Sequence, residues 1–211
     1  MTKFVTESGT WGSEMRIIFV TSNNGKVSEA SKIFAPLGHA VEQFLNDGIT
    51  PQFSEPQSEG IEEVTISKME QALVMTGGPA DDDTALMVED AGLFIESLGG
   101  FPGPYSSYVE EKIGLDGILR IMNGEENRNA EFRAVIAFHY LGQTHIFRGK
   151  CEGSIDLEKR GKGGFGYDPI FVPFDSDGRT CAEMSAVEKS SISHRGKALN
   201  KLLEFLAPPS M

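Results

Sequence analysis

Residues 16–20, Arg-Ile-Ile-Phe-Val, form a short apolar run rich in β-branched side chains, which is typical of a buried strand. A polar segment over 21–26 follows. The apolar residues of 27–37 then recur at helical spacing and stop at Gly38, a residue type favoured just after helix ends. A buried strand that leads through a short polar turn into a helix indicates an α/β fold.

The rest of the chain continues this alternation and then adds a hairpin. Leucines recur at i, i+3, i+4 and i+7 near the C-terminal end, which indicates an amphipathic helix. The further predicted elements are, in order, a strand over 40–45, a helix over 59–75, a strand over 84–88, a helix over 108–122, strands over 131–140 and 144–152, and a helix over 190–206. This order predicts a mixed sheet with flanking helices. We expect one domain over 15–207, preceded by a loose polar extension over 1–14.

The composition is that of an ordinary globular chain. Its 211 residues are 39% hydrophobic and 24% charged, enough to build a core without a disulfide or a structural metal. No apolar run approaches the roughly 18 residues of a membrane span, and residues 1–15 lack the apolar stretch of a signal peptide. Cys151 and Cys181 lie 30 positions apart and fit neither a disulfide framework nor a zinc motif. We therefore expect a reduced, cytoplasmic protein with no membrane partner.

The net charge argues against one class of partner. The chain has 19 Lys and Arg against 31 Asp and Glu, a formal charge of −12. Such a chain repels a phosphate backbone at long range, so we expect no nucleic-acid partner. A small phosphorylated ligand remains compatible, because a few local cations and backbone N–H groups can hold it, and Mg²⁺ can join it to carboxylates.

The polar segment 21–26, Thr-Ser-Asn-Asn-Gly-Lys, lies between a predicted strand and a predicted helix. Small polar residues and a glycine allow backbone N–H groups to converge at a helix N-terminus, and Lys26 adds a mobile cation, as phosphate binding requires. The segment is not a Walker A loop, because its spacing differs and Val27 follows the lysine. The pattern alone leaves two interpretations open: a phosphate site, or a helix cap with a solvated lysine.

Carboxylates from separate elements form a second candidate site. Glu89 and Asp90 follow the apolar run of 84–88, at the strand edge where α/β proteins usually bind ligands. Glu55 lies upstream, and Lys68 is on the helix between them. Such carboxylates can hold one Mg²⁺ through oxygen ligands, and one of them can orient an attacking water.

The glycine-rich segment 161–166 formally matches GxGxxG, but Tyr167-Asp168-Pro169 follows it where a dinucleotide site needs a helix. Glycines beside Phe165 and Tyr167 instead suggest a loop that can approach and stack on a flat ring. A plain flexible turn remains the alternative.

Residues 188–197, Glu-Lys-Ser-Ser-Ile-Ser-His-Arg-Gly-Lys, place three cations and a histidine at the start of the last predicted helix. Serines there can cap the helix, but cations are unfavourable at its N-terminus. We therefore expect Lys189, His194 and Arg195 to face something electronegative. The helix terminus by itself would place His194 and Arg195 on phosphate.

Four segments in this order resemble the Ham1/inosine triphosphatase family of noncanonical purine nucleoside triphosphate pyrophosphatases. They are TSNNGK, LMVEDAGLFIESLGGFPGPYSSYV, GGFGYDPIF and AEMSAVEKSSISHRGKAL, and the resemblance covers about residues 15–206. It implies an elongated two-lobed α/β fold with a central nucleotide-binding cleft. It also implies a homodimer and Mg²⁺-dependent hydrolysis of ITP, dITP and XTP to the monophosphate and pyrophosphate.

The resemblance also implies roles for individual residues. Asp90 and Lys68 would be catalytic, and Glu55, matched across a one-residue gap, would bind Mg²⁺ together with Asp90. His194 and Arg195 would recognise the purine rather than phosphate. The substrate-binding residues would be Thr21, Ser22, Asn23, Asn24, Gly25, Lys26, Ala91, Phe165, Gly166, Tyr167, Asp168, Lys189, His194 and Arg195. Glu89 and Ala91 depart from many bacterial relatives, which leaves the role of Glu89 open.

Two alternatives to this function remain. The chain could be a pyrophosphatase for another modified nucleotide, or a nucleotide sensor that does not turn its ligand over. A substrate panel with product analysis distinguishes them.

Overall fold

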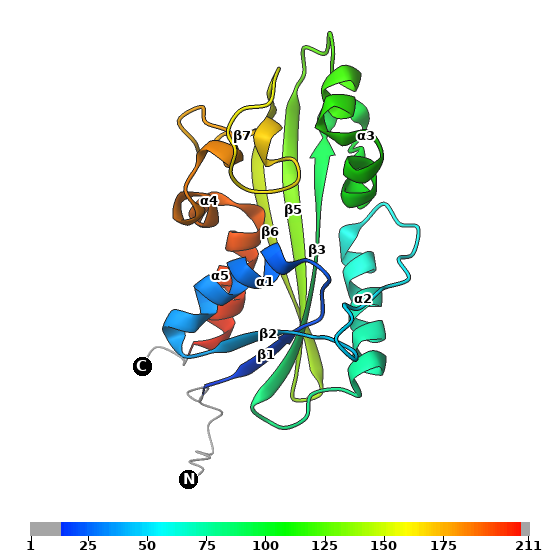
Figure 1. Ribbon diagram of the computed structural model, residues 1–211, viewed down its shortest axis with the longest axis vertical. Helices are drawn as coiled ribbons and strands as arrows, with labels where there is room; N and C mark the ends of the chain where they lie inside the picture. Colours follow the sequence, from blue (N-terminus) through cyan, green and yellow to red (C-terminus); the bar gives the residue numbers. More distant parts are fainter. Residues whose placement is uncertain (1–13, 208–211) are drawn as a thin grey trace.

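A computed structural model describes residues 14–207 of the chain and shows an elongated α/β molecule (Figure 1). Within these residues one mixed sheet of seven strands has the order β2-β1-β3-β5-β6-β7, and β4 pairs with β3 at one side. The predicted fold class is confirmed. Residues 1–13, which make up most of the predicted extension, lie outside the described residues.

The first part of the sheet is parallel. β1 (Arg16–Phe19) pairs with β2 (Ala40–Gln43) on one side and with β3 (Thr84–Ile95) on the other. α1 (Asn24–Phe34) connects β1 to β2, and a 3₁₀ turn over Ala35–Leu37 ends at Gly38 in the left-handed conformation, as the sequence predicts. α2 (Ile61–Thr76) connects β2 to β3.

The second part of the sheet is antiparallel and runs the length of the molecule (Figure 1). β5 (Asn129–Tyr140) pairs with β3 and with β6 (Gln143–Ile155), which forms the predicted hairpin. β7 (Phe171–Pro173) adds to β6, and β4 (Pro102–Gly103) adds to β3. The sequence pattern missed β4 and β7, because two or three residues carry too little periodicity to identify a strand.

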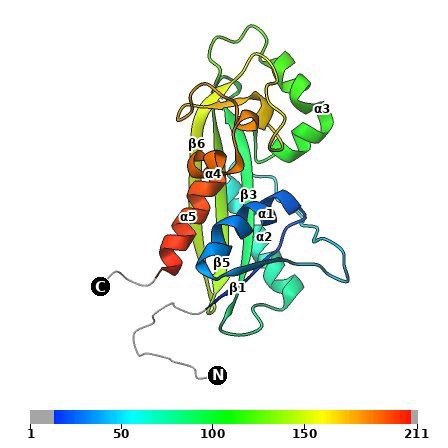
Figure 2. The same ribbon diagram turned by 60° about the vertical axis from the view of Figure 1, so that its left-hand side comes forward.

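Helices cover both faces of the sheet (Figures 1 and 2). α1, α4 (Ala186–Ile192) and α5 (His194–Leu206) lie on one face, and α2 covers the opposite face. α3 (Ser106–Ile121) packs on Leu93 and Ile95 of β3, which point to the same face as Ala85 and Met87. Alternate residues of β3 supply the two cores. Ala85 and Met87 pack with α1 and α5, whereas Leu86 and Val88 pack with α2.

Two predicted elements differ in a way that matters for the site. The strand predicted over 84–88 continues to Ile95, so Glu89 and Asp90 lie in the middle of β3 and not at its end. The helix predicted over 190–206 is two helices, because Ser193 is extended (φ −69°, ψ 154°) and separates α4 from α5. Ser193 accepts a hydrogen bond from the N–H of Gly196 and so caps α5.

Candidate active site

A cleft of about 560 Å³ opens at the carboxyl end of β1, and residues from both faces of the sheet line it. It gathers side chains from the 21–26 turn, the centre of β3, α2 and the segment before it, α3, the 161–168 loop, α4 and α5. All of the predicted site residues line it except Asn24, which is exposed, and Gly25, which lines a neighbouring cavity.

The acidic pair at the centre of the cleft owes its position to the end of β1. The parallel pairing stops at Phe19 opposite Met87, so Glu89 and Asp90 are the first residues of β3 beyond it whose side chains reach the cleft. The expectation that they end a strand is wrong, because β3 keeps its pairing with β5 through Ile95. The strand that ends beside Glu89 and Asp90 is the neighbouring strand β1, and not β3.

Glu89 and Asp90 turn to opposite faces of the sheet, as consecutive strand residues must. Asp90 continues the set of Leu86 and Val88 and meets Lys68 of α2, with 3.0 Å between Lys68 Nζ and Asp90 Oδ1. Glu89 continues the set of Ala85 and Met87 and meets cations of α1 and α5. Neighbouring carboxylates therefore belong to two different charge clusters.

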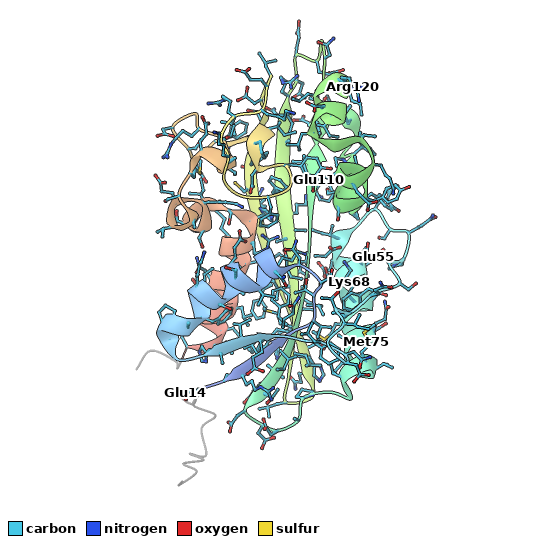
Figure 3. The ribbon with its side chains drawn as sticks, in the orientation of Figure 1. Glu14, Glu55, Lys68, Met75, Glu110 and Arg120 are labelled. Carbon is cyan, nitrogen blue, oxygen red and sulfur yellow. The ribbon has the colours of Figure 1, made fainter. Side chains whose placement is uncertain are left out.

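The Asp90 cluster consists of two carboxylates that share one lysine. Lys68 Nζ lies 2.7 Å from Glu55 Oε1 and 3.0 Å from Asp90 Oδ1. Figure 3 shows Glu55 beside Lys68, which lies near the middle of α2. Burial alone would lower the pKa of Lys68, but the two carboxylates outweigh it and raise that pKa. Burial raises the pKa of Asp90 against the opposing charges of Lys68 and Lys26, which makes its carboxylate a better proton acceptor.

The residues present fit a magnesium ion that is completed by its substrate. In the described part of the chain no three His, Cys, Asp or Glu side chains converge as a protein-only metal site. Asp90 Oδ2, however, is buried and has no hydrogen-bond partner among the described residues, and the carboxylate of Glu55 is half exposed beside it on the shared lysine. Mg²⁺ is usually held by one or two carboxylates together with substrate phosphates, and this donor set matches that pattern.

Glu89 lies between two cations from different helices. Its Oε2 is 2.7 Å from Lys26 Nζ, and its Oε1 accepts a hydrogen bond from Arg195 Nε at 3.2 Å. Burial alone would raise the pKa of Glu89, but the charges of Arg195 and Lys26 outweigh it and bring that pKa down to about 2. The carboxylate is therefore ionised at neutral pH although its side chain is only 1% exposed.

Of the two interpretations of the 21–26 turn, the structure shows the helix cap but not the solvated lysine, and phosphate binding stays a prediction. Asn23 caps α1, because its Oδ1 accepts hydrogen bonds from the N–H groups of Gly25 (2.8 Å) and Lys26 (3.3 Å). Those two N–H groups cannot bind phosphate unless the cap breaks. Lys26 itself is not solvated, since it is paired with Glu89 and also donates to the Glu89 carbonyl at 3.0 Å. What the turn offers a phosphate is mainly side chains.

The 161–168 loop is built around Asp168 and is not a loose turn. Asp168 Oδ2 accepts hydrogen bonds from the Phe165 N–H and from Lys189 Nζ, both at 2.7 Å. Gly164 has a φ of +70° and lies so close to this carboxylate that a Cβ would collide with it. Tyr167 anchors the loop to α3, because its hydroxyl donates to the Ser106 carbonyl at 2.7 Å.

The cations of α4 and α5 face carboxylates, as their position at a helix start led us to expect. Arg195 Nη1 donates to Glu29 of α1 at 2.6 Å, and Lys189 Nζ lies 3.4 Å from the same carboxylate. The Phe165 ring covers both cations, with its centroid 4.7 Å from Lys189 Nζ and 5.3 Å from Arg195 Cζ. A flat apolar face is therefore held directly against two hydrogen-bond donors.

His194 is packed on an aromatic ring. It stacks on Phe132 with 4.6 Å between centroids and 13° between planes, and only 7% of the residue is exposed. Burial and the nearby charge of Arg195 hold its pKa well below the ordinary value of 6.5. The imidazole is therefore neutral at physiological pH.

The sequence pattern missed part of the cleft wall. Glu110 and Phe132 line the cleft, and Glu29, which lines the neighbouring cavity, pairs with Lys189 and Arg195. Glu110 points from α3 toward the 161–168 loop (Figure 3), and burial and Asp168 raise its pKa. The remaining wall residues that sequence analysis did not single out as site residues are Val20, Thr50, Pro51, Gln52, Phe53, Gly92, Pro104, Ser106 and Ser107.

The fold and the cleft define an α/β protein that brings a metal-compatible acidic cluster and a covered cation pair to one site. The chain belongs to the Ham1 family, whose model matches residues 17–205. It is 46% identical to the dITP/XTP pyrophosphatase of Thermococcus kodakarensis over 91% of this chain and 97% of that protein. It is 45% identical to the dITP/XTP pyrophosphatase of Pyrococcus horikoshii over the same shares.

Solved structures agree with this assignment. The Ham1 protein of Staphylococcus aureus superposes with a TM-score of 0.74 at 30% identity, covering 90% of this chain and 97% of that one. A HAM1 protein from Coxiella burnetii gives a TM-score of 0.74 at 31% identity, covering 91% of this chain and 98% of that one.

Among the described residues, no helix has the length and apolar character needed to cross a membrane.

Proposed function

We propose that this protein hydrolyses noncanonical purine nucleoside triphosphates, namely dITP, XTP and ITP, to the monophosphate and pyrophosphate with Mg²⁺. The observation that carries the proposal is the group of Asp90, Lys68 and Glu55, which leaves a buried carboxylate oxygen without a donor in the cleft that also holds Lys26. The names and the high identity of the archaeal relatives support the same activity.

Asp90 and Glu55 are the residues that would hold the metal. When bound, Mg²⁺ supplies charge neutralisation at the phosphate oxygens and polarises the bond to the leaving group. Asp90 also orients the attacking water and accepts its proton. Lys68 and Lys26 stabilise the negative charge of the triphosphate, and their carboxylate partners hold them in the cleft before substrate enters.

The far end of the cleft selects the base. Phe165 provides a stacking face, and the cationic groups of Lys189 and Arg195 lie 4.7 Å and 5.3 Å from the centroid of its ring. A 6-oxo purine accepts such a donor at O6. Adenine carries an amino group there, which cannot accept from a cation, so each hydrogen bond that it fails to form costs about 1–3 kcal/mol relative to the 6-oxo purine. Tyr167 and Asp168 support this end by fixing the loop and Lys189.

We also propose that the protein acts as a homodimer in the cytoplasm and does not bind nucleic acid. The family resemblance supports the dimer. The formal charge of −12 argues against a polyanionic partner, and both cysteines are buried free thiols, which suits a reducing compartment.

The test is product analysis after incubation with Mg²⁺ and dITP, ITP, XTP, dGTP or dATP. We expect pyrophosphate and the monophosphate from the first three and little from the last two. Orthophosphate and a diphosphate would contradict cleavage between the α and β phosphates. Turnover confined to another modified nucleotide would move the assignment to a related pyrophosphatase, and binding without turnover would indicate a sensor.

A further inference from the structure

An uninterrupted series of charged contacts, here called the ionic chain, connects the two ends of the cleft. It starts at Lys26 on α1, passes through Glu89 to Arg195, and continues through Glu29 and Lys189 to Asp168. Cation and carboxylate alternate at every step. The first member lies at the end assigned to phosphate, and the last holds the loop assigned to the base.

Glu89 joins the two ends within this chain. Its two oxygens are divided between the ends, Oε2 toward Lys26 and Oε1 toward Arg195. The side chain of Glu89 is 1% exposed and that of Arg195 5% exposed, so this ion pair is buried, and removing one partner leaves the other buried charge uncompensated. Asp90, the next residue in the strand, faces the other side of the sheet and contacts Lys68, so the two carboxylates do not substitute for each other.

We propose that Glu89 is a positioning residue that couples base recognition to phosphate binding: its single carboxylate sets the positions of both Lys26 and Arg195. The inference rests on the proposed function for the identity of the substrate. When a base binds to Arg195, the contact between Arg195 and Glu89 changes. The contact between Glu89 and Lys26 then changes as well. A correct base thereby alters the cation that meets the phosphates.

The alternative is that Glu89 only neutralises buried charge. Loss of Glu89 would then lower stability and activity for every nucleotide alike. A positioning role predicts more than this, because Lys26 keeps its bond to the Glu89 carbonyl and Arg195 keeps its bond to Glu29 when the carboxylate is removed. Both cations would remain in the cleft, but one carboxylate would no longer set their positions relative to each other. We therefore expect the preference for dITP over dATP to decrease.

The first experiment compares nucleotide preference. Wild type, Glu89→Gln and Glu89→Asp are assayed with dITP and dATP, and binding of both nucleotides is also measured by calorimetry without divalent metal. We expect Glu89→Gln to raise KM for dITP and to narrow the dITP-over-dATP preference by about tenfold, in kcat/KM and in affinity, with Glu89→Asp intermediate. Glu62→Gln, which removes an exposed carboxylate paired with Arg148, is the matched control.

The second experiment tests the coupling without a base. Pyrophosphate is titrated into wild type and Arg195→Lys, which keeps the charge but lacks the Nε donor that contacts Glu89. Although pyrophosphate does not reach the base end, we expect its Kd to rise about fivefold in Arg195→Lys and to change little when the same substitution is made in Glu89→Gln.

These measurements separate the possible outcomes. An unchanged dITP-over-dATP preference in folded Glu89→Gln, or an unchanged pyrophosphate Kd in Arg195→Lys, would overturn the coupling. The Arg195→Lys titration needs no substitution at Glu89, so it decides the matter even where Glu89→Gln does not fold. If wild type fails to hydrolyse dITP while the binding differences hold, the proposed reaction fails and the coupling stands.

Discussion

Lys68 binds Asp90 through one carboxylate oxygen only and leaves the other oxygen, Oδ2, buried without a hydrogen-bond donor among the described residues. A buried carboxylate oxygen without a partner is unfavourable unless something outside the protein completes it. The cleft around it is lined by Glu55 and by Lys26. Metal and substrate together would satisfy the oxygen, so the cost in the free protein would be recovered in the complex.

Asp90→Asn should lower kcat by at least about 10²-fold while the nucleotide still binds, because the amide keeps the shape but loses the charge that orients water and holds metal. Pyrophosphate release and calorimetry with dITP measure the two properties separately. Asp116→Asn, which disturbs an exposed pair with Lys159, is the control. A rate within a few-fold of wild type would remove Asp90 from the reaction.

Lys68→Met should lower kcat about 10²-fold, because the triphosphate loses a buried cation. The same change frees both Asp90 and Glu55 from their shared lysine, so the concentration of Mg²⁺ that gives half-maximal activity should fall. Mg²⁺ titrations of the initial rate test this. Lys112→Met serves as the control, because Lys112 is exposed and pairs with Glu111. A higher Mg²⁺ requirement would mean that the carboxylates are not metal ligands.

Gly149→Ala should destabilise the fold by about 1–3 kcal/mol, a typical cost of overpacking. Gly149 lets β6 contact the backbone of α5, and a Cβ there would collide with the His194 carbonyl and lie 2.6 Å from the Ala198 nitrogen. Urea unfolding measures the change. The control is Gly60→Ala, where the nearest atom, Ser58 Oγ, would be 3.9 Å away. Equal stability of both variants would show that the helix moves aside freely.

His194 should make the protein less stable as pH falls. Its pKa in the folded state lies well below 6.5, so above pH 6.5 it is neutral in both states and contributes no pH dependence. Below pH 6.5 His194 takes up a proton in the unfolded chain but stays neutral in the folded protein. Stability therefore declines until the folded pKa is reached, by up to about 1.4 kcal/mol per pH unit.

His194→Asn removes this contribution, so unfolding free energies of wild type and variant should diverge between about pH 7 and about pH 5. Urea titrations at several pH values provide the comparison. Parallel curves for the two proteins would show that His194 takes up its proton as readily in the folded state as in the unfolded chain.

The local signals in the sequence identified most of the longer helices and strands and the segments that line the cleft, because apolar periodicity and polar turns depend on neighbouring residues only. Contacts between segments that are far apart in the chain leave no such local pattern in the sequence. Nothing near Lys26 in the chain shows that it pairs with Glu89, 63 positions later, so a solvated lysine remained possible. The strand through Glu89 and Asp90 appeared to end there, because its continuation depends on pairing with β5.

The break at Ser193 shows the same limit at shorter range. Serines at 190, 191 and 193 are compatible both with a helix and with a cap, and propensity does not choose between them. The choice follows from packing, since Lys189 must reach Asp168 while Arg195 reaches Glu29 and Glu89. One continuous helix would fix a different spacing between those two cations. The roles of the individual side chains remain predictions for the experiments above.

β3, β5 and β6, with 12, 12 and 13 residues, extend from one end of the molecule to the other. Both walls of the cleft are therefore attached to the same continuous strands. In the described part of the chain, no linker interrupts these three strands to act as a hinge between the walls. We therefore expect adjustment to a ligand mainly in the short segments attached to these strands, above all the 161–168 loop and α4. A compound designed to block this cleft would therefore gain more by fixing that loop than by wedging two rigid bodies apart.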